Sequence, residues 1–410
     1  MKVLLVGSGG REHALAWKLS SSPDLDELHV APGNPGIARF GDCHPVRAED
    51  GEGLLALASS LAADLVVVGP EAPLVAGVAD ELRHSGVAVF GPGRGAARIE
   101  GSKTFAKEVM RAAGVPTARA MSVARPPCVL KVDGLAAGKG VFVCRTQAEL
   151  DTSLRVAAAY GGALVIEELL EGDEVSLLAL ADGRDAVALP PAQDSKRLED
   201  GDLGPNTGGM GSFSPVPEVT PELVEELLET VHRPVLAELA ARETPFVGVL
   251  YAGLMLTESG PSVLEFNCRF GDPETQSLLP RLESDLLGPL AAAAAGELTG
   301  VELPVGRDAC VTVVLAADGY PEGRDVGTPI VGIDEAEAQG ALVFQAGTAL
   351  RGDRPVTNGG RILDVTALAP TLPEARDAAY SACERISFAG MRLRRDIALA
   401  AVGKWQHARG

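Results

Sequence analysis

The sequence predicts a multidomain chain of α/β and α+β units that begins with an open parallel sheet. Lys2–Val6 is a short apolar run, and the turn Gly7-Ser8-Gly9-Gly10 leads from it into a helix that begins near Glu12. A continuous apolar run before a helix is typical of a buried parallel strand. Further along, the apolar runs at 247–257 and 262–267 flank Glu258-Ser259-Gly260-Pro261 and indicate an antiparallel hairpin. A chain of 410 residues can hold two to four such units.

Composition narrows the class of protein. Hydrophobic residues make up 46% and aromatic residues only 4%, so Leu, Val and Ala must fill the cores. The net charge of −20 disfavours nucleic acid as a partner, because phosphate contacts need clustered Lys and Arg. The six cysteines form no Cys-x-x-Cys pair, which argues against zinc and against a disulfide framework. We find no membrane-length apolar run and no signal peptide, and we expect a cytoplasmic protein, with a monomer favoured.

The first unit, expected at 1–101, has further strands at 27–31, 65–69 and 87–91. Each strand closes with Gly or Pro, so the loops should gather at the carboxyl edge of the sheet, where ligands bind. The Gly7–Gly10 turn offers backbone N–H groups to a phosphate, with Arg11 and His13 as further donors. A plain tight turn is the alternative. A dinucleotide fingerprint would need glycine at position 12, where Glu12 stands.

The second unit, expected at 102–305, opens with a helix from Lys103 to Ala113 that Ser102 caps and Gly114 ends. Its part at about 116–190 predicts a β-rich lid with one helix. There, two β-rich runs flank the loop 133–140, which ends in Gly138-Lys139-Gly140. This loop departs from a P-loop in its spacing and lacks the Ser or Thr after lysine. We interpret it as a flap whose N–H groups and Lys139 close over phosphates, with Lys131 reaching the same anion.

Two later segments of the second unit predict binding loops. The strand at 164–166 breaks into a linker, whose free backbone groups suit the edge of an adenine; a charged surface loop is the alternative. The segment 193–211 is too rich in Gly, Asp and Asn for a helix or strand, and its mixed polar composition favours a shaped binding loop over a disordered one. Helices are expected within 221–242 and 286–296.

The hairpin strand at 262–267 carries a candidate cation site. Alternation along a strand places Val263, Glu265 and Asn267 on one side and Leu264, Phe266 and Cys268 on the other, apolar side. A carboxylate and an amide oxygen on one face can bind Mg²⁺, because substrate phosphates supply its remaining ligands. A strand end with solvated charges is the alternative.

The third unit, expected at 306–410, is strand-rich, opens with a strand at 308–316 and closes with a helix at 372–386. It contains Gly319-Tyr320-Pro321 and Asn358-Gly359-Gly360-Arg361. We expect it to pack against the other units and to form a wall of the site, without a catalytic group of its own.

Together, a glycine flap with lysines, an adenine-like linker and a Glu-x-Asn cation site resemble the ATP-grasp ligases. The resemblance is closer to one family, the phosphoribosylamine–glycine ligases, and runs from Met1 to about Ile397. The motifs that carry it are Gly7–His13, Gly69–Glu71, Lys131–Val141, Gly204–Gly211 and Glu265–Glu274.

The resemblance implies central ATP-grasp domains and ligation of glycine to 5-phosphoribosylamine through glycyl phosphate, with ATP and Mg²⁺ or Mn²⁺. The implied metal ligands are Glu265 and Asn267. The implied catalytic residues are Lys131, Asp194 and Arg269. ATP would contact Lys103, Lys131, Gly138, Lys139, Gly140, Glu167, Glu168, Leu170 and Glu174. The substrates would contact Gly9, Arg11, Gly33, Asn34, Asp194, Lys196, Pro205, Asn206, Thr207, Gly208, Arg269 and Asp272.

Three residues depart from the family pattern. Ser195 and Gln345 stand where histidines are expected, and Ala398 where glycine is expected. Rival interpretations are a sister ligase with another acid and amine, an NAD-dependent oxidoreductase, and a non-catalytic nucleotide-binding module. Glu12 speaks against the oxidoreductase, and the intact Lys131, Glu265 and Asn267 speak against the module.

Overall fold

The computed structural model describes residues 1–135 and 139–408, and its first unit is an open parallel sheet. The strand order is β3-β2-β1-β4-β5, and each neighbouring pair is parallel. The predicted glycine and proline loops therefore share the carboxyl edge. The strands are β1 (Lys2–Gly7), β2 (Glu27–Pro32), β3 (Asp42–Cys43), β4 (Leu65–Val68) and β5 (Ala88–Phe90). The helices are α1 (Gly10–Leu19), η1 (Ile37–Arg39), α2 (Gly51–Leu61), α3 (Glu71–Ala76), α4 (Val78–His84) and α5 (Arg94–Gly101).

Helix α6 (Lys103–Ala113) begins and ends where the sequence predicts. The Ser102 hydroxyl accepts a hydrogen bond from the Phe105 backbone N–H at 3.2 Å, and Gly114 ends the helix in the left-handed conformation. Both signals are local, because a cap contacts only its own first turn and a left-handed residue stops the helix by itself.

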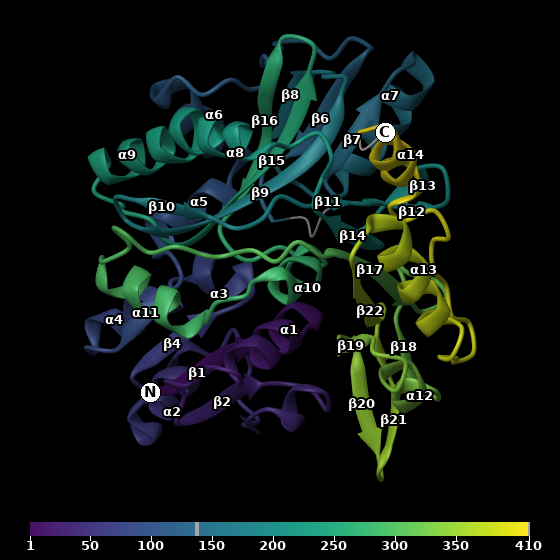
Figure 1. Ribbon diagram of the computed structural model, residues 1–410. Helices are drawn as coiled ribbons and strands as arrows, with labels where there is room; N and C mark the ends of the chain where they lie inside the picture. Colours follow the sequence, from purple (N-terminus) through teal and green to yellow (C-terminus); the bar gives the residue numbers. More distant parts are fainter. Residues whose placement is uncertain (136–138, 409–410) are drawn as a thin grey trace.

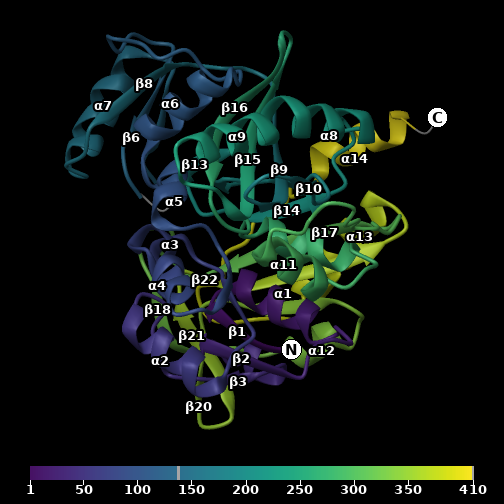
Figure 2. The ribbon, with the colours of Figure 1, turned by 90° about the vertical axis from the view of Figure 1, so that its left-hand side faces the viewer.

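The lid, predicted to be β-rich with one helix, is a three-stranded antiparallel sheet with one helix, whereas the strands at 173–182 and 186–188, also within the expected 116–190, belong to another sheet. Strand β6 (Cys128–Val132) lies between β7 (Val141–Cys144) and β8 (Leu164–Glu168). Helix α7 (Gln147–Ala158) connects the outer strands. Figures 1 and 2 place this sheet at the end of the molecule opposite the first unit.

A second antiparallel sheet, ordered β10-β9-β15-β16, carries the predicted hairpin. Its strands are β9 (Asp173–Asp182), β10 (Ala186–Ala188), β15 (Val247–Thr257) and β16 (Gly260–Asn267). The helices of this part are α8 (Pro221–Leu227), η2 (Leu228–His232), α9 (Arg233–Ala241), α10 (Glu274–Leu278), η3 (Leu279–Arg281) and α11 (Leu287–Ala295). The turn η2 is π-helical and lies just before Pro234, which has no N–H to continue an α-helical ladder.

The third unit contributes β17, β22 and β19 to a five-stranded sheet ordered β11-β14-β17-β22-β19. The first two strands come from residues before 305, so this sheet joins the second and third units. Its strands are β11 (Gln193–Asp194), β14 (Gly211–Ser214), β17 (Ala309–Ala316), β19 (Leu342–Gln345) and β22 (Arg361–Ala369). A smaller sheet holds β18 (Asp325–Pro329), β20 (Thr348–Arg351) and β21 (Arg354–Gly359), and the helices are α12 (Ile333–Glu337), α13 (Leu372–Cys383) and α14 (Leu399–Ala408).

Buried side chains connect the units. One hydrophobic cluster contains Leu4 of β1, Phe266 of β16 and Val313 of β17. Figure 1 shows the three units around a common centre, where α1, α10 and β22 lie close together. Within the described residues, no helix is long and apolar enough to cross a membrane.

Candidate active site

Glu265 and Asn267 lie on β16, opposite Gly253 and Tyr251 of β15. Because they are alternate residues of one regular strand end, their side chains share a face, as predicted. Asn267 is 9% exposed, and its side-chain amide takes part in none of the hydrogen bonds found among the described residues. The two side chains therefore offer a carboxylate and an amide oxygen to one ligand.

The predicted alternation is wrong on the N-terminal side of Glu265. A β-bulge lies between Val263 and Glu265, and Leu264 is its extra residue. Val263 consequently packs in the same buried cluster as Phe266 and Cys268. A bulge adds one residue to one strand, so every side chain before it changes face, and a period of two cannot reveal this.

Positive charges surround the Glu265 carboxylate. Burial alone would raise its pKa, but Lys196, Lys103, Lys131 and Arg269 lower the pKa to about 2. Lys196 Nζ lies 3.9 Å from Glu265 Oε1. Glu265 is therefore ionised throughout the neutral pH range, which a hard cation requires of a carboxylate ligand.

Lys196 itself lies among carboxylates. It forms an ion pair with Glu174, and although burial opposes it, Glu174 and Asp194 raise its pKa well above the ordinary value. Burial raises the pKa of Asp194 well above its ordinary value; Lys196 opposes this shift, and the charges of Glu274 and Glu174 add to it. Three acidic side chains, Glu174, Asp194 and Glu265, thus act on Lys196, and one of them is a candidate metal ligand.

The residues present fit a divalent cation that takes most of its ligands from phosphates. The protein supplies one ionised carboxylate and one amide oxygen, both hard ligands suited to Mg²⁺ or Mn²⁺. Across residues 1–135 and 139–408, no group of three or more His, Cys, Asp or Glu side chains is arranged to hold a metal. The protein therefore offers an open pair of ligands rather than a closed cage.

Lys131 and Lys107 share one buried carboxylate. Glu167 Oε2 accepts from Lys131 Nζ at 2.8 Å, and its Oε1 lies 2.7 Å from Lys107 Nζ. Lys131 also donates to the Leu264 carbonyl at 2.6 Å. Lys131 is thus fixed beside the candidate metal strand, while the carboxylate of Glu167, a predicted ATP contact, is committed to two lysines.

The hinge between β8 and β9 has free backbone groups at Leu170. The neighbouring Glu168 uses its backbone N–H with the Arg119 carbonyl at 3.1 Å, and its carboxylate accepts from the Arg119 N–H at 2.8 Å. In the described part of the chain, the backbone of Leu170 forms no hydrogen bond. Leu170 is half-buried, so its backbone edge is the part of this hinge that can meet a flat heterocycle.

The flap between β6 and β7 contacts the third unit. Lys139 Nζ donates to the Pro321 carbonyl at 2.7 Å, and the Gly140 carbonyl accepts from the Val132 N–H at 2.8 Å. Lys103 begins α6 at the base of the flap, where Thr104 Oγ1 donates to Asp133 at 2.7 Å. Gly138, predicted to contact ATP, lies outside the described residues.

The prediction that 193–211 contains no strand is wrong. Besides β11, it contains an antiparallel hairpin of β12 (Arg197–Glu199) and β13 (Leu203–Asn206). Gly201 and Asp202 have positive φ angles of 70° and 54° at the turn. The Gly and Asp residues thus mark a tight turn, which leaves short strands on either side.

The end of this segment, Pro205 to Gly208, is held by hydrogen bonds on both sides. Asn206 Nδ2 donates to the Val141 carbonyl of the flap strand at 3.0 Å. Thr207 Oγ1 donates to the Lys196 carbonyl at 2.9 Å. We call residues 205–208 the substrate loop, because the predicted substrate contacts of this segment concentrate there.

Arg269 and Asp272 follow β16 and lie beside the candidate metal ligands in the chain. Arg269 pairs with Glu71 at 3.2 Å and with Glu100 at 3.3 Å. Asp272 pairs with Arg361 at 2.9 Å; burial opposes its ionisation, but Arg361 and Arg11 lower its pKa. Glu71, Glu100 and Arg361 were not predicted as site residues.

The turn after β1 is occupied by a side chain of the protein. The Gly9 N–H donates to Glu12 Oε2 at 2.7 Å, and Arg11 Nε donates to Glu12 Oε1 at 2.5 Å. A Cβ at Gly7 or Gly69 would lie only 2.5 or 2.2 Å from Glu12 atoms. Glu12 therefore fills the crevice where a dinucleotide fold needs glycine, which counts against the oxidoreductase alternative.

The next loop along this edge has its polar groups in use as well. The Gly33 N–H donates to the Gly7 carbonyl at 3.0 Å. The Asn34 side chain donates to the carbonyls of Ser8 and Gln345 at 2.8 and 2.7 Å. Gly33 and Asn34 thus hold neighbouring loops together, whereas Gly9 and Arg11 bond to Glu12 next to them in the chain.

The three departures have different surroundings. The Ser195 backbone is held by Gly211 and Met210 at 2.9 and 2.8 Å. The Gln345 N–H donates to His13 Nδ1 at 2.7 Å, which makes it an interface residue. Ala398 has a φ of 62°, a conformation that favours the glycine expected there.

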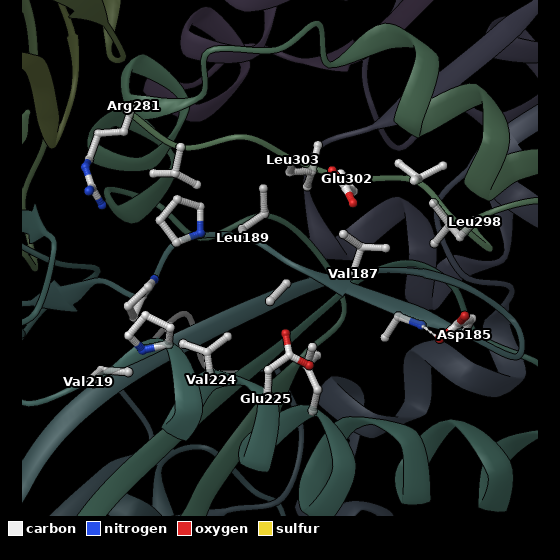
Figure 3. A pocket seen from close by; sticks show the side chains of 18 of the residues that line it. Asp185, Val187, Leu189, Val219, Val224, Glu225, Arg281, Leu298, Glu302 and Leu303 are labelled. Atoms are coloured by element: carbon white, nitrogen blue, oxygen red, sulfur yellow. Dashed lines mark hydrogen bonds between the residues drawn. The ribbon is translucent and has the colours of Figure 1, made fainter. Parts of the chain in front are cut away.

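A separate hollow of about 600 Å³ lies between β10, α8 and the segment 298–305. Figure 3 shows that Val187, Leu189, Val224 and Leu303 turn toward it, so its lining is mainly apolar. Its lining includes none of the predicted site residues.

Comparison with known proteins covers nearly the whole chain. Three family profiles of phosphoribosylglycinamide synthetase match: the N domain at 1–100, the ATP-grasp (A) domain at 101–275 and the C domain at 310–400. A phosphoribosylamine–glycine ligase from Streptomyces coelicolor is 51% identical, over 98% of this chain and 100% of its own. One from Agrobacterium fabrum is 47% identical, over 98% and 99%.

A comparison with solved structures also finds a phosphoribosylamine–glycine ligase. The phosphoribosylamine–glycine ligase of Thermotoga maritima superposes with a TM-score of 0.84 at 36% identity, covering 97% of this chain and 100% of that one. A biotin carboxylase from Campylobacter jejuni, solved as a beta-gamma-ATP complex, has a TM-score of 0.70 at 14% identity and covers 99% of this chain and 95% of its own. This second likeness concerns the fold alone.

Proposed function

Because this chain belongs to the phosphoribosylglycinamide synthetase family, whose curated members are phosphoribosylamine–glycine ligases, we propose that the cluster around Glu265 is its active site. The enzyme is an ATP-dependent ligase that makes glycinamide ribonucleotide from glycine and 5-phosphoribosylamine in purine biosynthesis. The observation that carries the site assignment is the Glu265 carboxylate, which four cationic side chains keep ionised beside the Asn267 amide, for which the described residues provide no hydrogen-bond partner.

In the proposed arrangement ATP lies between the lid and the β15–β16 hairpin. Glu265 and Asn267 would hold Mg²⁺ or Mn²⁺, which supplies charge compensation on the ATP phosphates when bound. Lys131, fixed by Glu167 at 2.8 Å, and Lys103 at the start of α6 would bind phosphate oxygens. Lys139 and the loop that contains Gly138 and Gly140 would cover them, and Lys139 would exchange the Pro321 carbonyl for phosphate. Glu167, Glu168, Leu170 and Glu174 would form the nucleoside end, with the Leu170 backbone against adenine.

Chemistry follows from positioning and charge stabilisation. A glycine carboxylate oxygen attacks the γ-phosphorus, the bond from that phosphorus to the β–γ bridging oxygen breaks, and ADP leaves. The ribosylamine nitrogen then attacks the carbonyl carbon of glycyl phosphate, loses a proton, and phosphate leaves. Arg269 would hold the carboxylate and then the acyl phosphate. Burial raises the pKa of Asp194, so this carboxyl would stay protonated up to a higher pH than an ordinary one and would donate a hydrogen bond while protonated.

Substrate contacts are proposed on three segments. Lys196, the substrate loop 205–208 and Asp272 would bind glycine and the ribosylamine. The carboxyl edge of the first sheet, at Gly9, Arg11, Gly33 and Asn34, would receive the 5′-phosphate, and Arg11 and Asn34 would exchange protein partners for it. We further propose a cytoplasmic monomer.

Phosphate release tests this function. With ATP and Mg²⁺, we expect phosphate only when glycine and freshly made phosphoribosylamine are both present. Glu265→Gln should lower kcat by about 100-fold or more, because it removes an ionised ligand from the charge-stabilising site. Glu258→Gln, on the exposed turn of the same hairpin, is the matched control and should keep wild-type activity. Turnover that needs another acid or amine would contradict the substrate assignment, and an active Glu265→Gln variant would contradict the metal site.

A further inference from the structure

Two side chains of the third unit fix one peptide of the substrate loop. The Tyr320 hydroxyl accepts a hydrogen bond from the Gly208 N–H at 2.9 Å. Arg361 Nη1 donates to the Gly208 carbonyl at 2.7 Å. Both backbone polar groups of Gly208 are therefore held by residues from beyond position 305.

Arg361 also holds Asp272. Its Nη2 lies 2.9 Å from Asp272 Oδ2, and its Nη1 donates to the Asp272 carbonyl at 2.8 Å. The Arg361 side chain is only 19% exposed, so these contacts are largely shielded from water. A guanidinium has several donors in one rigid plane, and here that plane sets Gly208 at a fixed distance from Asp272.

Gly208 is closely surrounded by the two side chains. A Cβ at this position would lie 3.3 Å from both Arg361 Cζ and the Tyr320 hydroxyl. Glycine thus permits the approach of both groups to the loop backbone. The contact is between a predicted substrate segment and the third unit, which was expected to pack and to form a wall of the site.

We propose that Tyr320 and Arg361 are positioning residues for the ligation reaction, and this rests on the proposed function of the site. They hold the Gly208 peptide and the Asp272 carboxylate in one arrangement, in which these groups bind glycine and the ribosylamine. The flap residue Lys139 contacts the backbone carbonyl of Pro321, whereas the hydrogen bonds and ion pairs of the Tyr320 and Arg361 side chains found among the described residues go to Gly208 and Asp272, neither of which is a predicted ATP contact. Their loss therefore raises the KM of the two other substrates and leaves the KM of ATP unchanged.

Tyr320→Phe is the decisive variant, because it removes one hydroxyl and keeps the ring. We expect the KM for glycine or phosphoribosylamine to rise about 5- to 50-fold, since the Gly208 N–H loses its partner. The KM for ATP should stay within about 2-fold. Tyr380→Phe is the matched control: it loses hydroxyl contacts to the Arg394 carbonyl and the Ile397 N–H, at 2.8 and 3.0 Å, in the same unit.

Arg361→Lys and Arg361→Met test the guanidinium. We expect Arg361→Met to raise the KM for glycine or phosphoribosylamine more than Arg361→Lys does, because lysine keeps the positive charge although it lacks the planar donors. Thermal unfolding shows whether each variant is folded, and if neither is, Tyr320→Phe decides. Equal kinetic constants for Tyr320→Phe and Tyr380→Phe, or a parallel rise in the KM of ATP, would overturn the proposal. Wild-type turnover tests the proposed function separately, because it does not depend on either variant.

Discussion

Ala398 shows how a single backbone angle can be unfavourable for the residue that occupies it. Its φ of 62° lies in the left-handed region, where a Cβ approaches the following carbonyl oxygen. Ala398 is also 5% exposed and packs in the main hydrophobic cluster. The strain is therefore kept by the packing around it.

We expect Ala398→Gly to raise the free energy of unfolding by up to about 1 kcal/mol. Relief of roughly 1–2 kcal/mol of backbone strain is offset in part by the greater freedom of glycine in the unfolded chain. Ala400→Gly in α14 is the control, and it should lower stability by about 0.5–1 kcal/mol, because its position is helical. Urea unfolding measures both. Equal losses in the two variants would contradict the strain argument.

Between elements, the carboxylate of Glu167 on β8 connects two lysines. Lys131 comes from β6 and Lys107 from α6, and the Glu167 side chain is only 3% exposed. A buried carboxylate between two ammonium groups is favourable only while all three keep their partners. This triad fixes the lid sheet against the helix that begins the second unit.

Glu167→Gln should lower the free energy of unfolding by about 2–4 kcal/mol, because two buried lysines lose their counter-charge. Glu171→Gln removes an exposed pair with Arg145, in which the side chains are 74% and 60% exposed, and should change stability by less than about 0.5 kcal/mol. Denaturant unfolding of both variants at neutral pH makes the comparison. A loss as small as that of the control would show that the triad is not a stabilising contact.

The elements also show which signals the sequence carries. The bounds of α6 were predictable because Ser102 and Gly114 act within one helical turn. The bulge at Leu264 was not, since it depends on the register with β15. Arg361 was noted in an Asn-Gly-Gly-Arg run, but its contact with Gly208, which is 153 residues away in the chain, could not be predicted. The periodicity of neighbouring residues cannot predict a contact over such a distance in the chain.

At the scale of the molecule, Asp364 lies at the junction of the three units. It is fully buried on β22, and its Oδ2 accepts from Gln276 Nε2 at 2.8 Å. A Cβ on Gly10 of α1 would lie 1.8 Å from Asp364 Oδ2. Burial and the charge of Asp272 raise the pKa of Asp364 to about 7, although Arg361 opposes them. This junction was unpredictable because each unit contributes part of it.

Asp364 should make stability depend on pH. Its pKa rises from 3.8 to about 7 on folding. Its contribution to the free energy of unfolding is therefore complete below about pH 4 and is lost as the pH rises toward 7. Asp364→Asn should remove this decline. The difference in free energy of unfolding between the variant and the wild type should therefore favour the variant by about 1–4 kcal/mol more at pH 8 than at pH 5.

The amide that Asp364→Asn introduces can still accept from Gln276 Nε2 and can donate to Gln276 Oε1, which has no partner among the described residues. Unfolding curves at pH 5 and pH 8 test this expectation, with the exposed Asp353→Asn as control. The same pH dependence in wild type and Asp364→Asn would contradict the assignment.

The contact of Gly208 with Tyr320 and Arg361 also sets an order of events during synthesis. The two partners lie 112 and 153 residues further along the chain. At about 5–20 residues per second, the ribosome needs roughly 6–22 seconds to reach Tyr320 from Gly208 and roughly 8–30 seconds to reach Arg361. The residues proposed to bind the nucleotide, from Lys103 to Glu265, precede Tyr320 in the chain, so a nascent chain contains them before the Gly208 peptide can be fixed.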